Sequence, residues 1–271
     1  MRTLFALALL AAATAPRAQS PGGDGAAGAP ARPRNVVFMI ADGFGPASEA
    51  MARAANGGPL ALDGVLTGAV STAATDSRVT DSAAGATAYA CGLKTYNGAI
   101  GVTPSGAPCR TVLEAARDAG LATGLVATSR ITHATPASYA SHVPRRADEA
   151  EIAAQMAGAR VDVLIGGGAR FFRPEAQGGS RTDGRDLLGE LLRQGVVVTT
   201  TRAGFDGLRD APAVALLAAD HMAYEIDRDE TDEPSLAEMA TKALDLLAAS
   251  PAGRDRGFFL MVEGSRIDHA G

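Results

Sequence analysis

Short apolar runs alternate along the chain with stretches whose apolar residues recur at helical spacing. The apolar runs cover residues 36–41, 122–128, 161–165, 196–199, 214–218 and 258–263. Runs of this kind that end at glycine or polar residues are typical of buried strands. Residues 236–249 carry apolar side chains on one face, and residues 185–194 also have a helical pattern. This alternation of strands and helices predicts an α/β domain.

Three of the predicted strands lead into side chains with oxygen donors. Asp42 directly follows the first run, Glu263 ends the last, and Thr135 comes after the second. Ligand sites of open α/β sheets lie at the carboxyl ends of the strands. Oxygen donors that converge there suit a hard or borderline cation. Asp42 is followed by glycine, so a solvated Asp-Gly turn is the alternative interpretation of that position.

A second pattern is the segment of residues 79–92, in which Asp81 and Ser82 precede a run of small residues. The small residues predict a tightly packed helix that begins near Ser82. Unpaired N–H groups and the positive end of the helix dipole favour an anion there, such as an alkoxide or a phosphate. Asp or Ser before a helix is also the ordinary choice for a simple N-cap. Taken alone, the segment leaves both interpretations open.

Residues 79–92 and 262–271 are long enough to be specific, and with the segments around Asp42 and Thr135 they resemble the alkaline phosphatase family. The resemblance runs from about residue 35 to residue 271. It implies a three-layer α/β/α sandwich with a large, mainly parallel sheet. It also implies hydrolysis of small phosphate monoesters through a phosphoserine intermediate, with two zinc ions and one magnesium ion as cofactors.

The resemblance assigns the reaction to three residues. Ser82 matches the nucleophile, which also binds zinc, Arg146 matches the arginine that grips the substrate phosphate, and Asp81 positions Arg146. A serine hydroxyl is a poor nucleophile until a metal lowers the pKa of that hydroxyl. A guanidinium can hold two phosphate oxygens at once.

The metal ligands are assigned by the same resemblance. Asp42 matches the carboxylate that bridges a zinc and the magnesium, and Thr135 and Glu263 match the other magnesium ligands. Asp268 matches a ligand of the second zinc. His133 stands where some family members have Asp and others His. There we favour a residue hydrogen-bonded to a metal-bound water over a direct ligand, and the imidazole leaves the metal preference of the third site open.

The resemblance places a zinc-binding histidine directly after Gly271 and further zinc ligands beyond it. His142, His221 and His269 stand outside those motifs, and His221 is interpreted as a structural or exposed histidine. The chain is therefore expected to be an N-terminal portion of an alkaline phosphatase, C-terminally incomplete, that cannot build either zinc site in full. Such a portion would expose a strand edge and apolar surface, so we expect poor solubility.

Other candidate sites have simpler interpretations. Residues 75–77 repeat a Thr-Asp-Ser triplet without the small-residue helix, which favours a loop. Residues 166–168 are three glycines without a nucleotide-binding fingerprint, which favours a tight turn. The acidic residues between 227 and 233 favour a solvated loop over a calcium site. Cys91 and Cys109 could form a disulfide or remain thiols, and their spacing leaves this open.

The N-terminus predicts export. Arg2 precedes an apolar run that ends in small residues, so residues 1–20 are interpreted as a signal peptide. Residues 21–34 are expected to be a disordered leader rich in Gly, Pro and Ala, and residues 35–271 to be the catalytic domain. The expected location is periplasmic or secreted. No later run is apolar enough for a membrane span, and the net charge of −5 gives no basic footprint for nucleic acid.

Two alternatives stand beside the phosphomonoesterase. One is a phosphodiesterase or sulfatase of the same superfamily, and the other is a catalytically inactive truncated product. Ser82, Arg146 and the magnesium-ligand set argue against the first, because monoester specialists of the family share them. The natural substrate and the oligomeric state stay open, a homodimer included.

Overall fold

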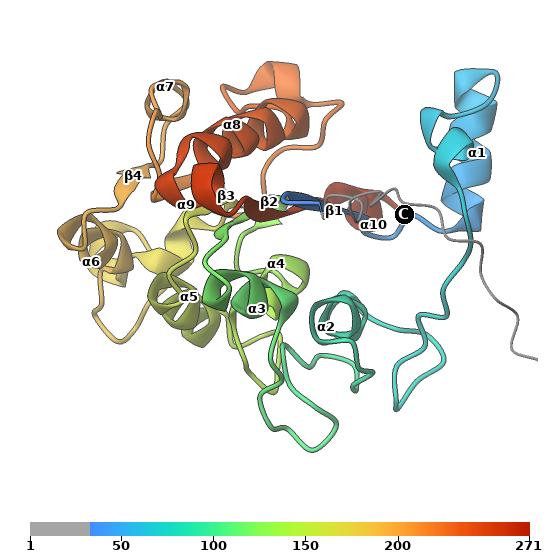
Figure 1. The fold of residues 1–271 in the computed structure, drawn as a ribbon, viewed down its shortest axis with the longest axis horizontal. Helices are drawn as coiled ribbons and strands as arrows, with labels where there is room; N and C mark the ends of the chain where they lie inside the picture. The colour runs from blue at the N-terminus through green and yellow to red at the C-terminus, as the bar shows by residue number, and fades with distance from the viewer. Residues whose placement is uncertain (1–32) are drawn as a thin grey trace, which may run out of the picture. The chain divides into compact units, whose positions relative to one another are not determined.

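Within residues 33–271, which the computed structural model describes, six parallel strands form one sheet in the order β1-β6-β2-β3-β5-β4 (Figure 1). The strands are β1 Val36–Ala41, β2 Ala122–Arg130, β3 Val163–Gly167, β4 Val197–Thr199, β5 Ala213–Leu216 and β6 Phe258–Gly264. The apolar runs of the sequence account for all of these strands, with small shifts at their ends. The expected signal peptide and most of the expected leader lie outside the described residues.

Helices connect the strands. The α-helices are α1 Pro46–Asn56, α2 Ser82–Cys91, α3 Val112–Asp118, α4 Ala134–Ala140, α5 Glu149–Gly158, α6 Leu187–Arg193, α7 Arg202–Asp206, α8 Leu236–Ala249, α9 Pro251–Asp255 and α10 Arg266–Ala270. Short 3-10 helices cover Ala61–Val65, Ala169–Phe172, Glu175–Gln177 and Arg228–Glu230. The predicted helix at 236–249 is α8, which begins with a reciprocal capping box between Ser235 and Glu238.

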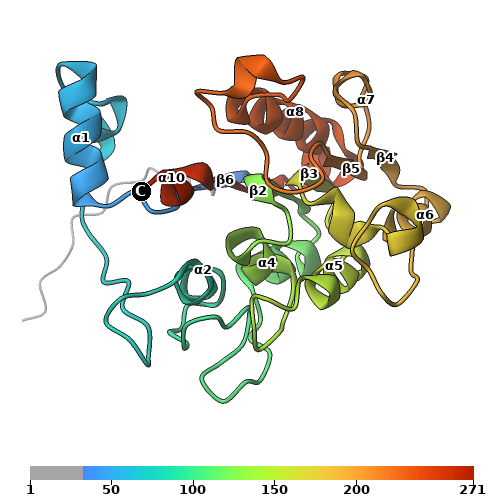
Figure 2. The same ribbon diagram turned by 180° about the vertical axis from the view of Figure 1, so that it is seen from behind.

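The helices cover both faces of the sheet. α2 to α6 lie on one face and α7 to α9 on the other (Figures 1 and 2). Along β6, Phe259 and Met261 pack into the core beneath the first group of helices, whereas Phe258, Leu260 and Val262 pack into the core beneath α8. Side chains of a strand alternate between the two faces of its sheet, so β6 is buried on both sides. The predicted three-layer α/β/α sandwich is confirmed.

β1 forms one edge of the sheet and carries exposed apolar side chains. Val37 is 45% exposed and Met39 is 70% exposed. Bare apolar edges of this kind promote association between chains. β1 is therefore an edge strand with exposed apolar side chains, and the poor solubility expected from the sequence stays a prediction.

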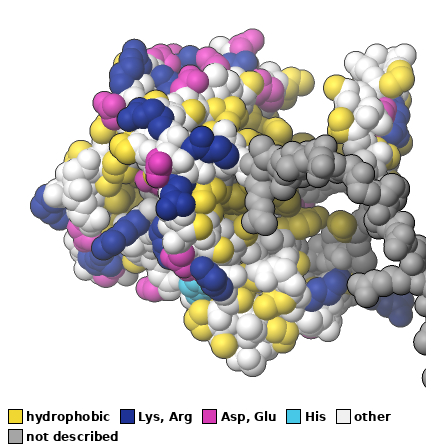
Figure 3. Space-filling view, viewed as in Figure 1, with side chains coloured by type: hydrophobic (Ala, Val, Ile, Leu, Met, Phe, Trp, Pro, Cys, Tyr) yellow, Lys and Arg dark blue, Asp and Glu magenta, His cyan; other side chains and the backbone are white. Residues whose placement is uncertain are grey.

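The surface carries both signs of charge. Over the face in Figure 3, Lys and Arg side chains intermingle with Asp and Glu side chains and do not gather into a single-sign stripe. No helix among residues 33–271 combines the length and the apolar character needed to cross a bilayer.

Several secondary candidates fall into loops or turns. Asp76, in the second Thr-Asp-Ser triplet, accepts a hydrogen bond from the backbone N–H of Asn97 and does not begin a helix. Gly168 follows β3 with φ of +90° and opens a turn. The sulfurs of Cys91 and Cys109 are bonded to each other, with their Cα atoms 6.0 Å apart.

Gly43 allows the chain after β1 to pass close to α10. Its φ is +76°, and a Cβ there would lie 2.5 Å from the Cα of Asp268. The backbone N–H of Asp42 donates to the carbonyl of Gly264 at 3.2 Å. The Asp-Gly pair therefore forms a turn, with Gly43 exposed and Asp42 partly buried, and this turn is also a close junction between two motifs far apart in the sequence.

This junction predicts a specific sensitivity. Gly43→Ala should lower the free energy of unfolding by at least about 2 kcal/mol, because it combines a left-handed backbone with steric overlap. Gly58→Ala is the matched control, since a Cβ at Gly58 meets no atom within 4 Å and its φ is not positive. Urea unfolding of both variants would measure the difference. Equal stability of the two variants would contradict this account of the junction.

Candidate active site

Ser82 is the first residue of α2, and its side chain is not used to cap the helix. Asp81 is the N-cap, and its Oδ1 accepts the backbone N–H of Ala84 at 2.9 Å. The Ser82 hydroxyl instead donates to Oδ2 of Asp42 at 2.8 Å. The capping role that the sequence left open thus belongs to Asp81, and Ser82 Oγ lies at the positive end of the helix next to a carboxylate.

Arg146 is held from two sides. Its Nη1 donates to Oδ2 of Asp81 at 3.0 Å, and its Nη2 donates to Nε2 of His133 at 2.8 Å. The backbone N–H of Arg146 donates to the carbonyl of Gly98. The backbone N–H of Gly98 in turn donates to Oδ2 of Asp81. The guanidinium is therefore oriented by one anionic and one neutral acceptor, beside the helix that carries Ser82.

Most of the predicted site residues line one cavity. Asp42, Ser82, Thr135, Arg146 and Asp268 all contribute to a cavity of about 680 Å³ at the carboxyl ends of β1 and β6. The structure thus brings together residues from four separated segments of the chain. Asp42 and Thr135 are two of the oxygen donors expected at strand ends, and Ser82, Arg146 and Asp268 are residues that the family resemblance assigned.

Glu263, on β6, does not line this cavity and is completely buried. Its Oε2 accepts from the Ser265 hydroxyl at 2.6 Å and from the Ser129 hydroxyl at 3.4 Å, whereas its Oε1 has no hydrogen-bond partner among residues 33–271. Burial raises the pKa of Glu263 to about 7, and the charge of Asp42 adds to the rise. An orphaned buried carboxylate oxygen of this kind indicates an absent partner.

The pKa of Asp42 is also raised. Burial raises the pKa of Asp42, the hydrogen bond from Ser82 opposes the rise, and the charge of Asp268 adds to it. Carboxylates that repel one another in a desolvated place favour a bound cation. Asp42, Thr135 and Glu263 offer only oxygen atoms, which are the donors that magnesium prefers.

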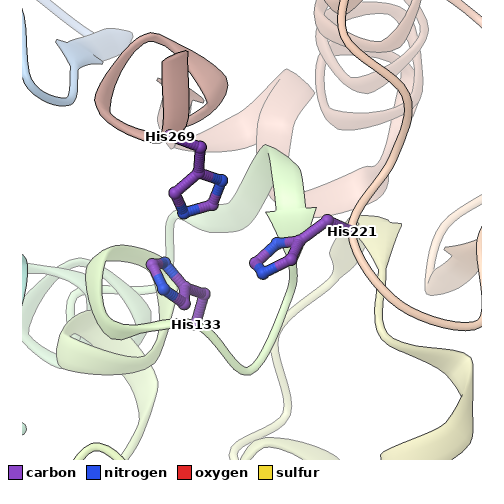
Figure 4. Close-up of side chains that lie close together, drawn as sticks. All are labelled: His133, His221 and His269. Atoms are coloured by element: carbon purple, nitrogen blue, oxygen red, sulfur yellow. The ribbon is translucent and has the colours of Figure 1, made fainter. Parts of the chain in front are cut away.

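Three histidines form a cluster that the sequence did not reveal. One nitrogen from each of His133, His221 and His269 lies within 4.8 Å of the others, and the three rings face one another in Figure 4. His133 precedes α4, His221 belongs to the loop after β5, and His269 lies on α10. The side chain of His221 is 20% exposed, and its ring packs against that of His133.

The rings of this cluster are held in the neutral form. Burial lowers the pKa of His133 to about 2, and the charge of Arg146 adds to the effect. Burial also lowers the pKa of His221 to about 4, helped by the charge of Arg130. His133 therefore meets Arg146 as a neutral acceptor, and its hydrogen bond to a metal-bound water stays a prediction.

Comparison with known proteins agrees with the geometry. The family model for alkaline phosphatase matches residues 33–271. The chain belongs to the alkaline phosphatase family. It is 48% identical over 267 residues to the repressible alkaline phosphatase of Saccharomyces cerevisiae, covering 88% of this chain and 47% of that protein. It is 40% identical over 253 residues to alkaline phosphatase 4 of Bacillus subtilis, covering 88% and 52%.

Solved alkaline phosphatases share the fold. The Thermus thermophilus enzyme superposes with a TM-score of 0.78 at 38% identity, covering 88% of this chain and 50% of that one. The enzyme of the Antarctic bacterium TAB5 superposes with a TM-score of 0.76 at 34% identity, covering 88% and 67%. The chain spans about half the length of the curated alkaline phosphatases it matches most strongly.

Glu263 gives a pH-dependent prediction for the metal-free chain. Its folded-state pKa lies above the ordinary value of 4.5, so its stabilising effect is full below pH 4.5 and is lost as the pH rises to about 7. In a chelator, the free energy of unfolding should fall by up to about 3 kcal/mol across this window. Glu263→Gln should remove this fall, and magnesium should reduce it.

Urea unfolding of both proteins across this pH range, with and without magnesium, provides the measurement. The comparison between Glu263 and its isosteric amide isolates one carboxyl from the other titrating groups. A stability that falls equally in the variant would contradict the assignment to Glu263.

Proposed function

We propose that the protein hydrolyses small phosphate monoesters through a phosphoserine at Ser82. The observation that carries this proposal is the position of Ser82 Oγ. The Ser82 hydroxyl does not cap α2, because Asp81 does. It donates to Asp42 and lines the same cavity as Arg146. A hydroxyl nucleophile, a carboxylate beside it and a guanidinium across the cavity are the parts that phosphoryl transfer requires.

Each of these residues has a distinct task in the proposed reaction. Arg146 holds two equatorial oxygens of the phosphoryl group, and Asp81 and His133 keep its guanidinium in place for that purpose. The N-terminus of α2, a helix of ten residues, favours negative charge on Ser82 and on the phosphate. The Ser82 hydroxyl loses its proton as its oxygen attacks phosphorus, the ester P–O bond breaks on the opposite side, and the leaving oxygen takes up a proton to become the alcohol. Water then attacks the phosphoserine, which releases inorganic phosphate and restores the Ser82 hydroxyl.

The donor set fits the metals that the family implies. Asp42, Thr135 and Glu263 would hold magnesium, as the orphaned Oε1 of Glu263 indicates. Asp42 and Ser82 would contribute to one zinc, and Asp268 to the second. When bound, zinc supplies a Lewis acid that stabilises the attacking and leaving oxygens. Variants of the TAB5 enzyme in which a histidine is replaced are described with magnesium bound in the M3 site.

Substrate, assembly and location are proposed from the relatives and the sequence. The streptomycin-6-phosphate phosphatase of Streptomyces griseus is 36% identical over 290 residues, which supports a small phosphorylated metabolite as the substrate. The signal peptide interpreted at residues 1–20 supports a periplasmic or secreted enzyme. A homodimer remains part of the proposal without a specific observation in its favour.

Hydrolysis of an aryl phosphate in zinc and magnesium tests this function. Ser82→Ala should lower the turnover by more than about a thousandfold, because it removes the nucleophile. Ser77→Ala is the matched control, since it removes the serine of the other Thr-Asp-Ser triplet and should leave the turnover unchanged.

The alternatives make different predictions for the same assay. A diester or sulfate ester hydrolysed faster than the monoester would favour the other branch of the superfamily. Absence of turnover by the unmodified chain in both metals would favour the inactive product.

A further inference from the structure

The orientation of the His133 ring depends on packing. Its Nε2 accepts from Arg146, and its Nδ1 is buried with no hydrogen-bond partner in the described part of the chain. Guanidinium nitrogens only donate, so Nε2 must carry the lone pair and Nδ1 the proton. A flip of the ring would replace Nε2 by a carbon and break the contact with Arg146. Among the described residues, the contacts that oppose such a flip are those of the ring with neighbouring side chains.

Two imidazoles supply that packing. The rings of His133 and His221 lie 5.3 Å apart at 78°, and those of His133 and His269 lie 5.3 Å apart at 80°. His221 and His269 lie 4.6 Å from each other (Figure 4). Edge-to-face contacts of this kind fix the plane of a ring as well as its position.

His221 is the anchored member of the pair. Nη1 of Arg130 lies 2.7 Å from Nε2 of His221, and the backbone N–H of Arg130 lies 3.2 Å from Nδ1. A neutral imidazole has one accepting nitrogen, so one of these two donors forms a hydrogen bond with the ring. The guanidinium of Arg130 is itself held by both carboxylate oxygens of Glu149 and by Asp220. Because its own guanidinium is held at three points, Arg130 fixes the ring of His221.

The cluster has poor surroundings for a metal ion. A metal would need a lone pair on each ring, yet Arg146 and Arg130 already face the Nε2 atoms of His133 and His221. Arg266 faces Nδ1 of His269 at 2.9 Å. Histidine ligands of metals usually donate their other N–H to carboxylates or carbonyls, and here the neighbours are cations.

We propose that His221 is a positioning residue for Arg146. Anchored by Arg130, it holds the His133 ring in the orientation whose Nε2 accepts from Arg146, and so orients the guanidinium toward phosphate. This inference rests on the proposed function, in which Arg146 grips the substrate phosphate.

Binding of inorganic phosphate to the full chain tests the proposal without turnover. His221→Ala should weaken phosphate binding about tenfold, as small displacements of positioning groups do. In an Arg146→Ala background the same change should have no further effect, because the arginine it orients is gone. His221→Phe keeps a ring against His133 but removes the nitrogens that face Arg130, so its phosphate affinity should lie between those of His221→Ala and the unmodified chain.

A second readout concerns the ring itself. Nitrogen chemical shifts of the His133 imidazole should report a proton on Nδ1 and an accepting Nε2, and His221→Ala should disturb this pattern. Equal losses of phosphate binding with and without Arg146, or an unchanged His133 ring, would overturn the proposal. Stoichiometric zinc binding that disappears with His221→Phe would also overturn it, in favour of a metal site. An inactive but phosphate-binding chain would overturn only the proposed function.

Discussion

Parallel pairing of β1 with β6 is the constraint on which the site depends. The register places Ile40 opposite Glu263 and Ala41 opposite Gly264, so the two strand ends deliver Asp42 and Glu263 to the same edge. Glu263 is then buried with an oxygen that has no partner, and the pKa values of both carboxyls are raised by burial. The sheet thus concentrates negative charge where water is excluded, and a divalent cation is the natural compensation.

The part of the site proposed to bind phosphate contains a positive charge, that of Arg146. Asp81 serves two functions, since one oxygen caps α2 and the other holds Arg146. This sharing ties the helix that presents Ser82 to the arginine across the cavity. A guanidinium fixed in this way loses little freedom on binding phosphate. The neutral His133 completes the support without competing for the charge that phosphate needs.

The sequence predicted the strands, the α/β class and the ligand-bearing strand ends, because apolar runs followed by Asp42 and Glu263 are local signals. The family resemblance added Arg146 and Asp268, and the structure places both in the cavity with Ser82. The position of His221 beside His133 and His269 could not be predicted in this way. Its neighbours, His133 and His269, come from distant segments, and no spacing in the sequence records their meeting. The hydrogen bond between His133 and Arg146 could not be predicted either, because only the fold brings these two side chains together.

The most direct test of the account is to trap the covalent intermediate. The chain would be incubated with an aryl phosphate, zinc and magnesium, quenched in acid, and digested for peptide mass spectrometry. The account predicts one added phosphoryl group on the peptide that contains Ser82, lost in Ser82→Ala and strongly reduced in Arg146→Ala. A phosphoryl group on another residue, or none on Ser82 while the ester is hydrolysed, would contradict the central claim.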